Sequence, residues 1–135
     1  MSADRRVDAF LRLAVADLDA AEVLARIGNH YAAYHLQQAV EKLEKALLLR
    51  RGIEAGIEHR LELLAARLPP GDAWHERLEE FLEYSAYGTS FRYPMPGGAI
   101  PHEPPATEVL TDVVTLRALV GLARAEPSGP TKRQA

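Results

Sequence analysis

The residues that could do chemistry form one polar stripe and one loop. Tyr34, Gln38, Glu41 and Lys45 are spaced 4, 3 and 4 residues apart, which places them on one side of a helix. An aromatic ring beside charged groups could stack a base or contact a partner helix. The same spacing fits a solvated face on which Glu41 and Lys45 form an ion pair worth about 0.3–0.5 kcal/mol. Because charged residues usually lie on exposed faces, the spacing alone favours the solvated face.

The loop is the stretch 88–104, which holds four prolines and three glycines. Structureless loops of this length are uncommon in compact domains and are usually functional or mobile. Arg92 and Tyr93 stand together in it, directly before Pro94. The arginine could hold a phosphate while the ring stacks a base. Alternatively, Phe91 and Tyr93 only pin the loop to the rest of the protein.

The histidines do not indicate a metal site or a catalytic centre. The five histidines are scattered, and only His75 has a carboxylate four residues later, Glu79. One such pair is far more often a surface contact than a pair of metal ligands. His59 is either a titrating group or a helix cap. Since the sequence also lacks a glycine-rich phosphate loop, HExxH and Gly-x-Ser-x-Gly, we predict no metal and no cofactor.

Composition and charge exclude further classes of protein. The chain has 135 residues, and its 16 basic and 19 acidic residues give a formal charge of 16 − 19 = −3. This balance argues against broad wrapping of nucleic acid but allows a local site. With no cysteine, disulfides, thiolate zinc sites and cysteine nucleophiles are excluded. We find no secretory leader and no apolar run of membrane-spanning length, so we expect a soluble, cytoplasmic protein.

Apolar residues recur with helical period along the whole chain, which predicts an all-α fold. We expect helices over about 4–27 and 30–51, a shorter one that uses residues 57–68, a fourth over 72–87 and a fifth from 105. Glycines or prolines follow the first four. Residues 1–126 are expected to form one domain, and 127–135 a disordered tail. The first helix should bury one stripe, composed of Val7, Leu11, Ala14, Leu18, Ala21 and Ala25.

The weak signals above occur in the order typical of one family. The chain resembles HEPN domains in three places. These are the run 16–52, the triplet His59-Arg60-Leu61, and Thr89 followed by Arg92-Tyr93-Pro94. The resemblance covers about residues 5–125. Within the run 16–52 the matching residues are Ala16, Asp17, Leu18, Gly28, Tyr31, Gln37, Gln38, Ala39, Glu41, Lys42, Lys45, Ala46 and Leu47.

The resemblance implies an up-and-down four-helix bundle with an additional short helix, commonly a homodimer. Small proteins of this family are often encoded beside a minimal nucleotidyltransferase, with which they resemble paired subunits or toxin–antitoxin systems. Some branches are metal-independent ribonucleases, and others are linked to nucleotide binding. In the ribonucleases, four to six residues stand between an arginine and the histidine that follows it. Here three residues stand between Arg26 and His30, seven between Arg51 and His59, seven between Arg67 and His75, and nine between Arg92 and His102.

We therefore predict a non-catalytic HEPN-type binding subunit that binds a nucleotide or RNA, or partners a minimal nucleotidyltransferase. A ribonuclease toxin that uses Arg92 with His102 or His59 is the alternative, and a purely structural homodimer is the second alternative. The polar stripe could equally be a dimer seam near Gln37 and Gln38. The candidate ligand or partner contacts are Tyr34, Gln38, Glu41, Lys42, Lys45, His59, Arg92 and Tyr93.

Overall fold

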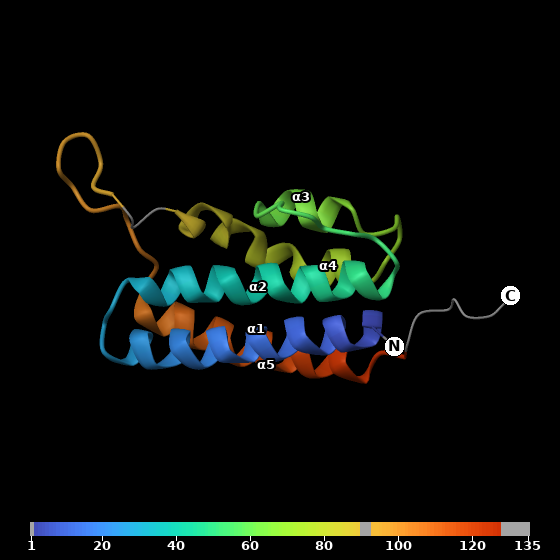
Figure 1. The fold of residues 1–135 in the computed structure, drawn as a ribbon. Helices are drawn as coiled ribbons and strands as arrows, with labels where there is room; N and C mark the ends of the chain where they lie inside the picture. Colours follow the sequence, from blue (N-terminus) through green and yellow to red (C-terminus); the bar gives the residue numbers. More distant parts are fainter. Residues whose placement is uncertain (1, 90–92, 128–135) are drawn as a thin grey trace, which may run out of the picture.

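The computed structural model describes residues 2–89 and 93–127. Every regular element in these ranges is a helix, so the predicted all-α fold is confirmed (Figure 1). Arg92 and the tail residues 128–135 lie outside the described residues. No described helix has the length and apolar character needed to cross a membrane. The elements are α1 (Ser2–Arg26), α2 (Tyr31–Arg50), α3 (Leu61–Ala66), α4 (Trp74–Leu78), the 3-10 helix η1 (Glu79–Gly88) and α5 (Ala106–Ala125).

Helix α2 lies at the centre of the molecule. It packs against α1 and α5 on one side and against α3 and η1 on the other (Figure 1). As a result, 13 of its 20 residues are buried. An apolar stripe accounts for only part of a helix surface, so a helix covered on both sides must also bury polar side chains. This arrangement determines the site described below.

The turn between α1 and α2 forms where the sequence predicts it. Gly28 has a φ of 72°, a left-handed conformation that glycine adopts without strain. The Asn29 backbone N–H donates to the Leu24 carbonyl at 2.8 Å, which closes the end of α1. The Asn29 side-chain oxygen then accepts from the Tyr31 N–H at 2.8 Å. The predicted stripe on α1, from Val7 to Ala25, is buried against the core.

The third helix is shorter than predicted. It begins at Leu61, and Ile57, expected on its apolar face, is 88% exposed. The backbone just before Leu61 explains the difference, because Arg60 is extended, with φ −78° and ψ 119°, and Gly56 before Ile57 is left-handed, with φ 61°. The chain from 53 to 60 is therefore an irregular segment, which we call the cover segment.

The fourth helix changes type along its length. The Asp72 carboxylate accepts from the Trp74 N–H at 2.9 Å, directly before the first turn of α4. The α-helix ends at Leu78, and the chain continues to Gly88 as a 3-10 helix. The buried residues Leu78, Phe81 and Tyr84 recur every three residues, which is the period of a 3-10 helix. The burial of every third residue, which matches the three residues per turn of a 3-10 helix, therefore fits the change from α-helix to 3-10 helix.

Helix α5 completes the bundle. It begins directly after Pro105 and buries Val109, Val113, Leu116, Val120 and Ala123. Its middle is joined to η1 by the Tyr84 hydroxyl, which donates to Asp112. Its end is joined to α2, because Arg51 pairs with Glu126 at 3.2 Å. The loop before it projects beyond the end of the bundle (Figure 1).

Candidate functional site

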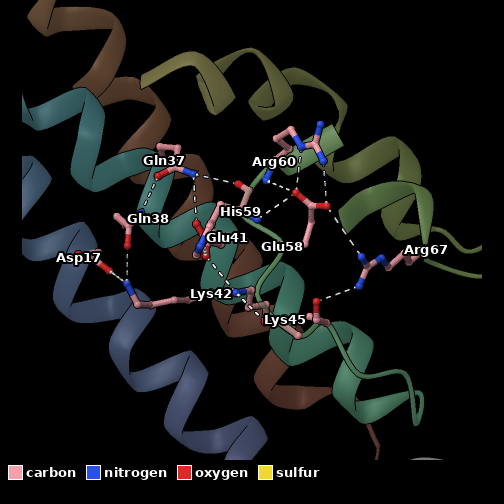
Figure 2. A network of polar contacts seen from close by, with 12 residues as sticks. Asp17, Gln37, Gln38, Glu41, Lys42, Lys45, Glu58, His59, Arg60 and Arg67 are labelled. Atoms are coloured by element: carbon pink, nitrogen blue, oxygen red, sulfur yellow. Dashed lines mark hydrogen bonds and ion pairs between the residues drawn. The ribbon is translucent and has the colours of Figure 1, made fainter. Parts of the chain in front are cut away.

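The polar stripe of α2 is covered rather than solvated. The Glu41 and Lys45 side chains are only 8% and 11% exposed, and their ion pair measures 3.1 Å. The expectation of a solvated face, drawn from spacing, is therefore wrong. The cover segment causes the difference, because it runs across this side of α2 (Figure 2). Lys45 donates to the Gly56 carbonyl at 3.5 Å, which holds the segment in place.

A continuous line of polar contacts begins on α1. Asp17 pairs with Lys42 at 2.6 Å. The Lys42 ammonium also donates to the Gln38 side-chain oxygen at 3.2 Å. Gln38 in turn donates to the Gln37 oxygen at 2.8 Å (Figure 2). The line therefore connects α1 with the middle of α2 through side chains alone.

Gln37 carries the line to the cover segment. Its amide nitrogen donates to Glu41 at 3.3 Å and to the His59 carbonyl at 3.4 Å. The residue is 1% exposed. Gly88, at the end of η1, also lies against it, because a Cβ added there would be 3.4 Å from the Gln37 Cδ. Gln37 therefore links three elements, although the sequence argument singled out its neighbour Gln38.

Glu41 and His59 form the pair with the most evident chemistry. The His59 Nδ1 lies 2.9 Å from the Glu41 carboxylate, which also holds Lys45. The carboxylate is buried, whereas the His59 side chain is 73% exposed. A carboxylate that accepts from Nδ1–H fixes the ring and leaves Nε2 for another partner. This imidazole is thus held from inside the protein and faces solvent.

Beside His59 lies a shallow depression lined by residues 54–60 and Arg67. The Glu58 carboxylate lies among the hydrogen-bond donors that line this depression. One carboxylate oxygen accepts from the backbone N–H groups of His59 and Arg60, each at 3.1 Å, and from the Arg60 Nε at 3.0 Å. Arg67 lies 3.9 Å from the other oxygen. The Arg60 side chain, followed by the backbone N–H groups, lowers the pKa of Glu58 to about 2. The depression therefore already holds one negative charge, that of Glu58, and Glu54 also lines it.

Glu44 is a buried acid that the sequence argument did not single out. It is 1% exposed, and neither carboxylate oxygen has a hydrogen-bond partner in the protein. Burial, together with the charges of Glu41 and Glu62, raises its pKa to about 10. The side chain is therefore protonated at neutral pH. A signal exists in the sequence, because Glu44 lies four residues from both Val40 and Leu48, which are core residues.

The structure brings together five of the predicted residues, namely Gln38, Glu41, Lys42, Lys45 and His59. Tyr34 lies near them, edge-on to His35, whose Nδ1 is 3.0 Å from Asp17. Tyr93 is 76% exposed and belongs to the projecting loop. Arg92 lies outside the described residues.

The cations of the site differ in their availability. Lys42 and Lys45 are largely covered, and each is paired with a carboxylate on the protein side. Arg60 and Arg67 are more open, with side chains 66% and 39% exposed. An incoming anion would therefore meet Arg60 and Arg67 before it met either lysine. Within the described residues, no three histidine, aspartate or glutamate side chains converge as metal ligands.

Comparison with known proteins agrees with this all-helical structure. The family model described as the HEPN domain matches residues 7–120, which is most of the 135-residue chain. The match spans most of α1, the whole stretch from α2 to η1 with the cover segment, and most of α5. No curated protein and no solved structure gives a significant match.

Proposed function

The chain belongs to the HEPN domain family, and on that premise we propose that it is a non-catalytic binding subunit for a phosphate-bearing ligand. The ligand is a nucleotide or an RNA end. Its phosphate occupies the depression beside His59, Arg60 and Arg67. The subunit acts as a homodimer and pairs with a minimal nucleotidyltransferase.

One observation carries the binding site. Two arginines and two backbone N–H groups already surround a carboxylate, that of Glu58. Guanidinium groups and backbone N–H groups are also the donors that bind phosphate. His59 adds an outward-facing imidazole whose other nitrogen is fixed by Glu41. The site is therefore an anion site in which an acidic side chain of the protein occupies the position of the ligand.

The sequence supports a binding role rather than catalysis. In the ribonucleases of the family, four to six residues stand between an arginine and a histidine, and none of the arginine–histidine pairs given above has that interval. Cleavage of RNA without a metal needs a base and a cation placed together. His59, Arg60 and Arg67 line one depression, so it is the missing interval that supports binding over cleavage.

The test is titration of the purified protein with fluorescent nucleoside triphosphates and 5′-phosphorylated short RNAs. We expect Arg60→Ala and Arg67→Ala each to weaken binding by about tenfold, the cost of one charged hydrogen bond of about 1.4 kcal/mol. Glu58→Gln should strengthen binding, because it removes the competing charge. Arg26→Ala is the matched control, since this arginine pairs with Glu22 on the exposed surface of α1. Absence of binding, or binding that both arginine variants leave unchanged, contradicts the proposal.

A ribonuclease is the second candidate, and the His59–Glu41 pair is the observation that favours it. A carboxylate that orients an imidazole is a common arrangement for a general base. Incubation of labelled RNA with the protein in metal-free buffer tests this function. Cleavage that His59→Gln abolishes would replace the binding proposal with the ribonuclease.

A further inference from the structure

A cavity lies between the second half of η1 and the first turn of α5, at the end of the bundle from which the loop projects (Figure 1). Its volume is about 250 Å³. Pockets for drug-sized ligands usually measure about 300–1,000 Å³, so this cavity suits a smaller group. None of the residues that line it also lines the depression beside His59.

Two tyrosines of η1 supply the aromatic surface of the cavity. The ring centroids of Tyr84 and Tyr87 lie 5.8 Å apart, and the ring planes are tilted by 53°. Tyr84 is buried, and its hydroxyl donates to Asp112 of α5, which holds the two elements together. Tyr87 is only half-buried. The face of such a ring attracts a cation that comes within about 6 Å of its centroid.

The opening of the cavity carries negative charge. Glu83 of η1 and Glu108 of α5 line it, and both side chains are exposed. Within residues 2–89 and 93–127, neither carboxylate pairs with a cation. Apart from the imidazole of His102, no described side chain that lines the cavity can carry a positive charge. Burial raises the pKa of Tyr87, and the charges of the two glutamates and of Glu103 raise it further.

The N-terminus of α5 does not make this cavity an anion site. Pro105 precedes the first residue of α5 and lines the cavity, and a helix N-terminus attracts negative charge. Glu108 in the first turn already supplies that charge. An incoming anion would be repelled by Glu83 and Glu108, so the cavity favours a cation.

The combination of a ring face with carboxylates favours one type of cation. A guanidinium group is planar and weakly hydrated, stacks on aromatic rings, and forms paired hydrogen bonds with carboxylates. An ammonium group is compact and strongly hydrated, so it loses more on leaving water for a cavity lined partly by tyrosine and proline. Both features of the cavity therefore match guanidinium better.

We propose that the cavity between η1 and α5 binds a guanidinium group, which stacks on Tyr87 and bonds the carboxylates of Glu83 and Glu108. The group belongs to a small guanidine compound or to an arginine side chain, which share this chemistry. The inference goes beyond the proposed function and does not depend on it, because the phosphate depression is formed by other residues.

Nuclear magnetic resonance titration of the isotope-labelled full chain tests the site. At constant ionic strength, N-ethylguanidinium should shift the amide signals of Tyr87 and Glu108 in a saturable way, with a Kd on the order of 1 mM for so small a ligand. N-ethylurea, which has nearly the same shape but no charge, should not bind, and ethylammonium should bind several-fold more weakly. Absence of saturable shifts, or equal binding of N-ethylurea or ethylammonium, overturns the inference.

Substitutions separate the site from general attraction to an acidic surface. Glu83→Gln and Glu108→Gln should each weaken binding roughly fivefold, as expected for a partly exposed ion pair. Tyr87→Leu should weaken it by a similar factor, whereas Tyr87→Phe, which keeps the ring, should not. Glu79→Gln is the matched control, because Glu79 is exposed on η1 but does not line the cavity. Circular dichroism verifies folding. Equal losses in the Glu79 and Glu83 variants, or no loss in either lining glutamate variant, contradict the site.

An arginine peptide distinguishes the two sources of the group. Acetylated, amidated Gly-Arg-Gly that binds about tenfold more tightly than N-ethylguanidinium assigns the site to an arginine side chain of a protein. Peptide binding that is equal or weaker assigns it to a small guanidine compound. Nucleotide titrations of Glu83→Gln should match those of the wild type, so the phosphate proposal stands or fails separately.

Discussion

Helices α1 and α2 place polar and apolar side chains in opposite ways. On α2, Gln37, Glu41 and Glu44 are buried, whereas on α1, Leu13, Val23 and Ile27 are exposed. The buried polar groups of α2 mostly have partners inside the chain. The exposed apolar groups of α1 lie on the molecular surface. One face is therefore completed by the cover segment, and the other is open to solvent.

The difference shows that exposure alone does not identify function. By composition, the α2 stripe is the more polar surface, but most of its charge is already neutralised by contacts inside the protein. The exposed side of α1 has the position of an ordinary solvent-facing helix surface, but its apolar side chains remain in contact with water. The comparison makes quantitative predictions, because the two helices offer matched substitutions.

The largest effect is expected for Glu41→Ala. The substitution leaves Lys45, a largely buried cation, without its carboxylate, and it removes the partners of His59 and Gln37. Breaking a buried ion pair by removing one member costs about 3–5 kcal/mol of unfolding free energy. Urea unfolding monitored by circular dichroism measures the loss.

Asp8→Ala provides the matched control for that measurement. Asp8 and Arg12 have the same four-residue spacing as Glu41 and Lys45, but both side chains are exposed on the surface of α1. Exposed ion pairs contribute little to stability. If the two variants lose equal stability, the network on α2 is no stronger than a surface pair.

A second effect concerns pH. The carboxyl of Glu44 ionises near its ordinary pKa of 4.5 in the unfolded chain, whereas burial raises its pKa to about 10 in the folded protein. Unfolding therefore releases a proton between these values, and the free energy of unfolding falls as pH rises through this window. The slope from this group is at most about 1.4 kcal/mol per pH unit.

Glu44→Gln removes the titrating group while keeping its shape. We expect the variant to be close to the wild type near pH 4.5 and increasingly more stable than it toward pH 9. Urea unfolding at a series of pH values gives both curves. Parallel curves would mean that Glu44 is ionised in the folded state, and hence that it has a partner.

The smallest effect is expected for Val23→Ser, measured at dilutions where the chain is monomeric. The side chain is 60% exposed, and substitutions at such positions usually change stability by less than about 0.5 kcal/mol. Val40→Ser on α2 is its counterpart, because Val40 is fully buried and its loss should cost about 2 kcal/mol or more. Similar losses at both positions would indicate that the α1 face is covered within the monomer.

Helical period was sufficient to predict the fold, because α1, α2 and α5 each bury residues at intervals of three and four. The same rule was wrong at Ile57, because the backbone is extended at Arg60 and the helix begins only at Leu61. Part of the site was also predicted from the sequence. Glu41, Lys45 and His59 were among the candidate residues, and the structure joins them. Their burial was not predictable from spacing, because it depends on a segment that is neither helix nor strand. Gln37 and Glu58 were not among the candidate contacts, because their roles depend on how the cover segment lies across α2, which brings the His59 carbonyl to Gln37 and turns the His59 and Arg60 N–H groups toward Glu58.

The cover segment is attached to α2 largely through side chains, since the bonds at Gly56 and at the His59 carbonyl come from Lys45 and Gln37. Beyond Ile53 and Ala55, which pack against the core, such a segment can separate from the bundle without breaking a turn of α2. Segments of this type open far more readily than the whole protein unfolds. The amide protons of residues 53–60 should therefore exchange with deuterium well before those in the middle of α2. Opening would expose the side chains of Glu41 and Lys45. The protein would then transiently present a distribution of surface charge that differs from that of its closed state.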